Sequence, residues 1–272
     1  MESDSVLDLE AYFARIGYSG GREPTPETLR ALHLAHVTHV PFENLDVLLG
    51  RPIRLDLASL QAKIVRDRRG GYCFEQNGLF AAVLEKLGFN LTRLAARVRL
   101  GSTRIMPRTH MTLLVEAGGE SWLADVGFGG WGLLEPIPLI AGRNYQQGMW
   151  TSRLEREGAH WVLQCPETGM GSAQSGAQYV FNLEPQLPVD YELPNHYCST
   201  HPDSRFVQTL TAQMASQSAR HMLRGREYSI VEPDRTRTET VQSAAEFSRI
   251  LEESFGLHLP PGSILSWPPG AR

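Results

Sequence analysis

The hydrophobic periodicity of the chain changes abruptly at Gly88. Before this glycine, apolar residues recur at helical spacing, as in the stripe that runs from Leu9 to Ile16. After it come short segments of alternating or continuous apolar character, separated by glycine-containing turns such as "AGGE" and "EGAH". This pattern predicts a helical region followed by an antiparallel sheet or small barrel over roughly residues 90–185.

Turn and cap residues place four helices in the first region. The first is expected to end at Gly17, and the second to begin with Thr25 as its cap and Pro26 at its first position. A third is expected over residues 57–67. The fourth begins near the stretch "RRGGYCFEQNGLF" and ends at Gly88.

The C-terminal third mixes two kinds of signal. Residues 184–205 have the composition of a connecting segment, and strand-like pieces follow on both sides of an Arg-Gly turn. A helix capped by Ser243, with Glu246 at the capping-box position, ends at Gly256. The tail "LPPGSILSWPPG" is not expected to be helical. We therefore predict an α+β fold divided into residues 1–88, 89–185, 186–206 and 207–272.

Bulk composition excludes several classes of protein. The net charge of the 272 residues is −4, which gives no electrostatic argument for binding nucleic acid or a membrane surface. No apolar run approaches the ~20 residues of a membrane span, and the acidic N-terminus lacks the features of a signal peptide. Cys73, Cys165 and Cys198 are too widely spaced for a metal knuckle, so we expect a reducing, cytoplasmic location and no metal.

Cys73 stands out because two glycines precede it and a helical run follows it. The free N–H groups and the positive dipole end of a helix that starts here would stabilise a thiolate. Gly70 and Gly71 would keep side chains away from the sulfur. The alternative is a buried, inert cysteine, which is the commoner fate of a single cysteine in a cytosolic protein.

A base for this cysteine is expected in the segment "RTHMTLLVEAGGESWLADVGFGG", which has the pattern of a β-hairpin. A loop at Gly118–Gly119, or over residues 117–120, makes His110 and Asp125 diagonal neighbours, whereas a loop at residues 117–118 places them directly opposite each other. Both registers put the pair on one face of the hairpin. Asp125 follows apolar strand residues, where a carboxylate is costly unless something pairs with it. The three residues would form a Cys73, His110, Asp125 triad of the kind found in cysteine proteases, at the boundary between the helical region and the sheet.

Two other patterns were weighed as sites. His33, His36 and His39 recur every three residues, which spreads them over a wide arc of a helix, with no carboxylate or cysteine to complete a metal site. "GFGGWG", residues 127–132, fits G-x-G-x-x-G, but the proline-containing segment after it cannot form the helix that binds a dinucleotide. The glycine loop could still offer backbone N–H groups to a ligand.

The combination of "RGGYCFEQNGLF", "THMTLLV", "WLADVGFGG" and the upstream "PFENLD" resembles the arylamine N-acetyltransferases. The resemblance covers nearly the whole chain. It implies a helical bundle, an antiparallel β-barrel and an α/β lid, with an interdomain helix. It also implies that acetyl-CoA, a cosubstrate, acetylates Cys73, and that an arylamine, arylhydrazine or N-arylhydroxylamine then takes the acetyl group in a ping-pong cycle.

Several further residues match positions of known role in this family. Thr109, Gly129 and Gly130 match positions near the pantetheine and CoA. The resemblance implies an acceptor pocket with flat apolar walls for an aryl ring. Its lining would be Phe42, Val98, Phe128 and Phe206. Arg15, Glu43 and Arg69 match polar positions that tie the helical region together around the nucleophile.

Three alternatives use the same residues differently. An amide synthase of macrolactam biosynthesis would need an open cleft and a carrier-bound acyl chain. A hydrolase or transglutaminase-type enzyme would release its acyl group without an arylamine. A binding module would carry an unreactive Cys73, slow to alkylate at pH 6. The sequence leaves the physiological acceptor, the preferred acyl-chain length and the oligomeric state open.

Overall fold

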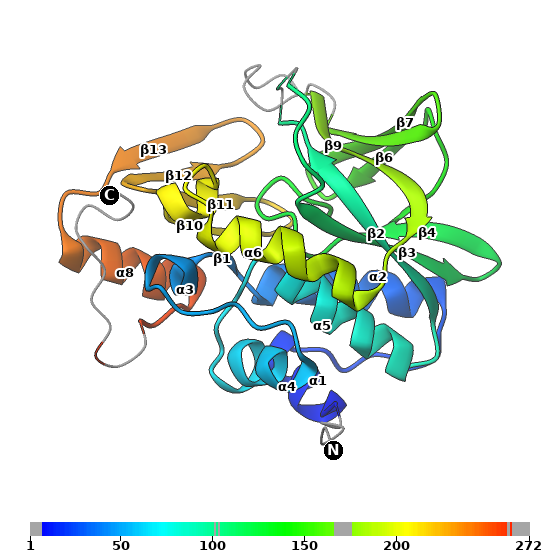
Figure 1. Cartoon of the computed structure of the whole chain (residues 1–272), viewed down its shortest axis with the longest axis horizontal. Helices are drawn as coiled ribbons and strands as arrows, with labels where there is room; N and C mark the ends of the chain where they lie inside the picture. Colours follow the sequence, from blue (N-terminus) through cyan, green and yellow to red (C-terminus); the bar gives the residue numbers. More distant parts are fainter. Residues whose placement is uncertain (1–6, 101, 103, 166–175, 260–261, 263–272) are drawn as a thin grey trace.

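A computed structural model describes residues 7–100, 102, 104–165, 176–259 and 262. Figure 1 shows a helical region at the bottom, a curled sheet at the upper right and a smaller sheet at the left. A long helix crosses in front of them. None of the helices in the described ranges combines the length and the apolar character that a bilayer-spanning helix requires.

The helical region is built on the helix that carries Cys73. Its elements are α1 (Leu9–Ile16), α2 (Pro26–His39), α3 (Leu45–Leu48), α4 (Leu57–Leu60), a π-helical segment (Gln61–Arg66) and α5 (Cys73–Lys86). The Thr25 side chain caps α2, with Pro26 at its start, and Gly17 ends α1 in a left-handed conformation, as the sequence predicts. α5 buries Leu79, Phe80 and Leu84 in the largest core cluster.

The second region is an eight-stranded antiparallel sheet. Its strands are β2 (Asn90–Val98), β3 (His110–Ala117), β4 (Glu120–Ala124), β5 (Ile137–Pro138), β6 (Asn144–Gln147), β7 (Trp150–Glu157), β8 (His160–Cys165) and β9 (Gly176–Pro185), in the order β5-β4-β3-β2-β9-β8-β7-β6. Leu123 of β4 and Leu154 of β7 share one buried cluster with Tyr179 of β9. Residues from opposite ends of the strand order meet in one core, so the sheet curls into a nearly closed barrel.

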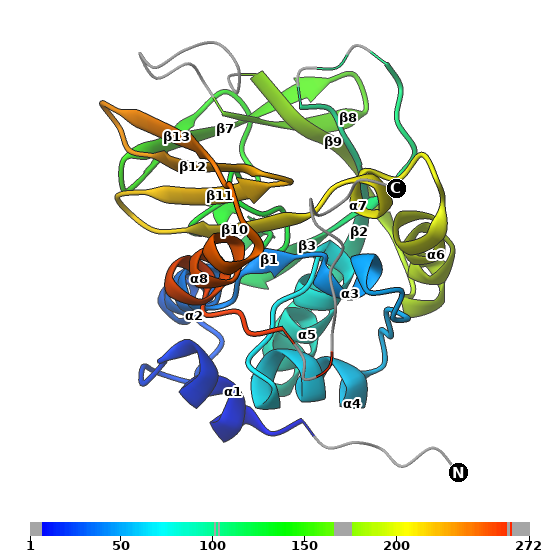
Figure 2. The same cartoon turned by 90° about the vertical axis from the view of Figure 1, so that its left-hand side faces the viewer.

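The third region is a five-stranded antiparallel sheet covered by one helix. It contains β10 (Thr211–Ala215), β11 (Arg220–Arg224), β12 (Glu227–Val231), β13 (Thr236–Thr240) and the helix α8 (Ala244–Phe255). A short strand from the helical region, β1 (Phe42–Glu43), forms its edge by pairing with β10. Figure 2 shows this sheet in front of the barrel and above the helices, with α8 beneath it. We call this region the lid sheet.

The connection between barrel and lid sheet contains more helix than its composition indicated. A 3₁₀ turn (Pro188–Tyr191) leads into α6 (Glu192–Thr200), the long helix of Figure 1, and a short helix α7 (Arg205–Gln208) precedes β10. Pro194 does not prevent α6 because it lies in the first turn, where its missing N–H has no intrahelical partner to lose. We also expected a strand-like piece directly after this segment, over residues 205–214. Its first half is wrong, because Ser204 caps the helical turn α7 and the strand β10 starts only at Thr211.

The α+β fold class is confirmed. The expected tail at residues 259–270 lies almost wholly outside the described residues, so its conformation stays a prediction.

Candidate active site

Cys73 is the first residue of α5 and is almost fully buried, with 3% of its surface exposed. The backbone N–H of the preceding Tyr72 donates to the Glu75 carboxylate at 3.0 Å, which fixes the start of the helix. The Cys73 thiol lies 3.6 Å from the Thr109 carbonyl oxygen. The sulfur therefore lies at the positive end of the helix and against the chain that leads into β3.

His110 and Asp125 approach each other across the β3–β4 hairpin. Ala117 pairs with Glu120 around the Gly118–Gly119 turn, so the hairpin has the diagonal one of the two expected registers. The His110 Nε2 and the Asp125 Oδ2 are 2.6 Å apart, and both side chains are buried. The side chain of His110 also lies close enough to Cys73 for each group to shift the pKa of the other. Because Nε2 faces Asp125, Nδ1 is the nitrogen left for the thiol.

The protonation of these three groups follows from their contacts. Burial lowers the pKa of His110, but Asp125, and to a smaller extent Cys73, raise it to about 10. Burial raises the pKa of the Asp125 carboxyl, and His110, Asn77 and the Gly127 N–H more than reverse this. Burial also raises the pKa of the Cys73 thiol, and contact with His110 opposes that effect. Asp125 thus favours the form of the pair in which a shared proton lies on His110.

Asp125 is held by two residues that the sequence did not link to the triad. Asn77, one helical turn after Cys73, donates to Asp125 Oδ1 at 2.9 Å and to the Met111 carbonyl at 2.8 Å, and accepts from Val126 N–H at 3.0 Å. His33 Nε2 accepts from the Asp125 backbone N–H at 3.0 Å. The only sequence signal for Asn77 was a polar residue at i+4 from Cys73 on an apolar helix. His33 gave no such signal.

Glycines let the barrel and the helical region approach the cysteine closely. A Cβ on Gly127 would lie 2.7 Å from the Cys73 Cα atom and 2.7 Å from the Asn77 amide nitrogen. A Cβ on Gly70 would overlap the Pro41 carbonyl. Gly70 is thus required for backbone packing, and not to open a path to the sulfur as the sequence indicated.

A buried network of ion pairs lies on the other side of the α5 N-terminus. Arg69 pairs with Glu43 at 2.8 Å and Asp46 at 3.3 Å, while Lys63 pairs with Asp46 at 2.8 Å and Glu75 at 2.6 Å. We call these five residues the ion-pair network. Arg15 lies nearby and donates to the carbonyls of Ile64 and His39 at 2.9 and 2.6 Å. The placement agrees with the structural role expected for Arg15, Glu43 and Arg69.

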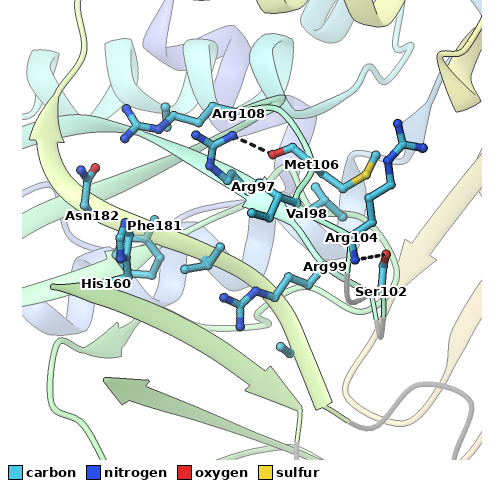
Figure 3. A pocket seen from close by; sticks show the side chains of 14 residues that line it. Arg97, Val98, Arg99, Ser102, Arg104, Met106, Arg108, His160, Phe181 and Asn182 are labelled. Atoms are coloured by element: carbon cyan, nitrogen blue, oxygen red, sulfur yellow. Dashed lines mark hydrogen bonds between the residues drawn. The ribbon is translucent and has the colours of Figure 1, made fainter. Parts of the chain in front are cut away.

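The expected substrate residues have different immediate neighbours in the structure. Phe42 and Phe206 lie together, with ring centroids 5.9 Å apart, and Phe128 contacts His110 at 5.1 Å. Val98 instead lines an outer pocket of about 540 Å³ between β2, β9 and the chain before β3 (Figure 3). The lining of this pocket includes four arginines: Arg97, Arg99, Arg104 and Arg108. None of the triad residues and none of the three phenylalanines lines this pocket. Val98 also pairs across the sheet with Tyr179, whose ring contacts Phe128.

Three residues were expected near the acetyl donor. Thr109 contacts the Cys73 thiol through its carbonyl, while Gly129 and Gly130 lie in the loop after Asp125. The roles of all these residues stay predictions. Among the described residues, no group of three His, Cys, Asp or Glu side chains could hold a metal ion.

Comparisons with known proteins agree with this geometry. The family profile described as N-acetyltransferase matches residues 25–264. An arylamine N-acetyltransferase of Escherichia coli (strain K12) is 40% identical over 258 residues, covering 92% of this chain and 88% of that protein. The solved M. smegmatis arylamine N-acetyl transferase superposes with a TM-score of 0.88 at 39% identity, covering 95% of this chain and 96% of that one.

A Mycobacterium marinum arylamine N-acetyltransferase, solved in complex with CoA, superposes with a TM-score of 0.86 at 36% identity. The match covers 92% of each chain. The similarity therefore extends through the helical region, the barrel and the lid sheet together.

Proposed function

The chain belongs to the arylamine N-acetyltransferase family, and from this premise we propose that Cys73 carries the acetyl group in a two-step transfer. The donor is acetyl-CoA, and the acceptor is the nitrogen of an arylamine, arylhydrazine or N-arylhydroxylamine. The observation that carries the proposal is the chain of contacts Cys73–His110–Asp125, with the sulfur at the start of α5.

In the first step, the Cys73 thiolate attacks the carbonyl carbon of the acetyl thioester. A C–S bond forms to Cys73, the bond to the CoA sulfur breaks, and His110 donates its proton to the departing CoA thiolate. The raised pKa of His110 supports this role because Asp125 keeps the imidazole charged while the thiolate reacts. The free N–H groups at the start of α5 favour the negative charge on the sulfur.

In the second step, the acceptor nitrogen attacks the acetyl carbon on Cys73. His110, neutral after the first step, takes a proton from the nitrogen, and the Cys73 thiolate leaves. Asp125 stabilises the imidazolium that forms and holds the ring so that Nδ1 faces the sulfur. Asn77 and His33 hold Asp125 in turn, so these two are positioning residues.

For the acceptor, we propose that Phe42, Phe128 and Phe206 form the aromatic walls, with Val98 farther out. For acetyl-CoA, we propose contacts with Thr109, Gly129 and Gly130. The closeness of Phe128 to His110 and of the Thr109 carbonyl to Cys73 supports these assignments. The free thiols of Cys73, Cys165 and Cys198 fit a reducing compartment, and we expect the protein in the cytoplasm.

Two buried cysteines provide a matched test. Cys73 and Cys198 are each 3% exposed, and each thiol lies near the Thr109 carbonyl, at 3.6 and 4.0 Å. Cys73→Ala should reduce acetyl transfer to an arylamine by more than about 10³-fold, whereas Cys198→Ala should change it less than about threefold. Transfer that persists in Cys73→Ala would refute the acetyl-cysteine intermediate.

The same assay separates the alternatives. A hydrolase would release acetate at the same rate with or without an arylamine. An amide synthase would fail to become acetylated by acetyl-CoA. The proposed enzyme should release CoA at a sustained rate only when an arylamine is present.

A further inference from the structure

Arg220, on β11 of the lid sheet, is buried without an acidic partner. Its side chain is 2% exposed, and within the described ranges no carboxylate lies within ion-pair distance of it. Its Nε hydrogen also has no acceptor among the described atoms. Burying an unpaired cation costs several kcal/mol, so its environment must offset this in another way.

Contacts with the glycine loop, which we define as residues 128–132, offset the cost of burying this cation. The Arg220 Nη1 donates to the Gly130 carbonyl and, at 3.2 Å, to the Gly132 carbonyl. The guanidinium also lies over the Trp131 ring at 5.3 Å and the Trp150 ring at 4.5 Å. One planar cation thus joins the lid sheet to the glycine loop and to β7 of the barrel.

A second lid residue holds the same loop. Gln213 on β10 accepts a hydrogen bond from the Gly130 N–H at 2.6 Å. On the side of the triad, Phe128 at the start of the loop lies against His110 at 5.1 Å. In the described part of the chain, the backbone N–H groups of Phe128 and Gly129 have no hydrogen-bond acceptor. The loop is therefore fixed at Gly130 and Gly132, while the N–H groups of Phe128 and Gly129 stay available.

A purely packing role does not explain this arrangement. An apolar side chain of similar volume would fill the space without the cost of a buried cation, and replacing buried ionic groups in this way is often neutral or stabilising. Arginine does what an apolar residue cannot: it donates in a plane to two carbonyls while stacking on two rings. The restraint of the loop carbonyls is thus the feature that needs arginine.

We propose that Arg220 is a positioning residue for the acetyl donor. By holding the carbonyls of Gly130 and Gly132 toward the lid sheet, it leaves the N–H groups of the glycine loop oriented to donate to acetyl-CoA. This inference rests on the proposed function, because it assigns the loop to the donor side of the same site. It makes the lid sheet a part of the donor site through two residues, Arg220 and Gln213, that themselves need not touch the ligand.

The test compares two acetyl donors, acetyl-CoA and p-nitrophenyl acetate, which has no pantetheine arm. Acetylation of Cys73 is followed at varied donor concentration in wild type, Arg220→Met and Arg220→Lys. For both variants, the KM for acetyl-CoA should rise about tenfold or more, while kcat/KM for p-nitrophenyl acetate stays within about threefold of wild type. Lysine keeps the charge but cannot stack a planar cation on the Trp131 and Trp150 rings while it donates to the loop carbonyls, so it should not restore the KM.

Arg224→Met is the matched control, since Arg224 is on the same strand but is exposed. It should leave both donors unaffected. Gln213→Leu tests the second restraint on the loop, and should raise the KM for acetyl-CoA even if Arg220→Met does not fold.

Three results would overturn the inference: equal losses with both donors, an unchanged KM for acetyl-CoA, or full recovery in Arg220→Lys. If wild type reacts with p-nitrophenyl acetate but never with acetyl-CoA, the proposed function fails, and this inference fails with it.

Discussion

Two groups of buried ionisable side chains meet at the N-terminus of α5, and they differ in the kind of cation they contain. In the ion-pair network, Lys63 and Arg69 bind the carboxylates of Glu43, Asp46 and Glu75. In the triad, the carboxylate of Asp125 binds His110. The side chains of the network and of the triad are similarly buried, but only histidine can gain and lose a proton near neutral pH.

The pKa shifts of Lys63 and Asp46 show how the network differs from the triad. Burial lowers the pKa of Lys63, but Glu75, Glu43 and Asp46 raise it above its ordinary value, so it stays charged. Burial raises the pKa of Asp46, and Lys63 and Arg69 lower it below its ordinary value. The charges of Lys63 and Asp46 are therefore fixed, and the network supports the helix start that carries Cys73. In the triad, the shared proton can move, and that permits chemistry.

The largest expected effect is on the rate of Cys73 acetylation, and it differs between two buried aspartates. Asp125→Asn should slow acetylation of Cys73 by about 10³-fold, because a neutral amide does not stabilise the His110 imidazolium. Asp46→Asn should change the rate of the folded protein less than about threefold. Rapid mixing with acetyl-CoA and detection of released CoA measures both. If the two variants lose activity equally, the division between the two groups is wrong.

The second prediction concerns stability instead of rate. Lys63→Met leaves Glu75 buried without its cation, so the free energy of unfolding should fall by about 3 kcal/mol. Urea denaturation measures this. Arg249→Met, which removes an exposed pair with Glu253, should cost less than about 1 kcal/mol. If Lys63→Met is as stable as Arg249→Met, the network does not support the helix start.

The third prediction compares two buried asparagines with three hydrogen bonds each. Asn77 holds Asp125, whereas Asn44 joins the carbonyls of Phe206 and Thr209 to the Thr211 N–H. Asn77→Ala should slow acetylation about tenfold through misplacement of Asp125. Asn44→Ala should lose comparable stability yet acetylate within about threefold of wild type. Equal acetylation rates in the two variants would contradict the positioning role of Asn77.

The smallest effect is the pH dependence of stability. The folded pKa of His110 is raised to about 10, so its contribution is complete below its unfolded value near 6.5 and is lost as the pH rises through about 10. The folded pKa of Asp125 is lowered, so its contribution is present above its unfolded value of 3.8 and is lost as the pH falls through the folded one.

The difference in unfolding free energy between wild type and Asp125→Asn should therefore be largest between about pH 4 and 6.5 and decrease toward pH 10 by more than about 1 kcal/mol. Urea titrations of both proteins at several pH values measure it. A difference that does not change with pH would contradict the charged His110–Asp125 pair.

The features that the sequence predicted are local ones. Thr25 and Pro26 specify the start of α2, and the two glycines of the β3–β4 turn set the register that brings Asp125 to His110. The fold class could be predicted because the period of the apolar residues changes from helical to strand-like at Gly88 and mixes both signals in the C-terminal third.

The features that could not be predicted from the sequence depend on contacts between distant parts of the chain. His33 reaches the Asp125 N–H from α2, and Arg220 reaches the glycine loop from the lid sheet. Neither residue lies in a local pattern that indicates its partner. The need for glycine at position 70 could not be predicted either, because it depends on the position of the Pro41 carbonyl in the fold.

Mass spectrometry of the intact protein after mixing with acetyl-CoA alone tests the acetyl-cysteine intermediate most directly. One acetyl group should be added per chain, on the peptide that contains Cys73, and it should disappear when an arylamine is added. No adduct on Cys73, or an adduct that persists in the presence of an arylamine, would contradict the two-step transfer.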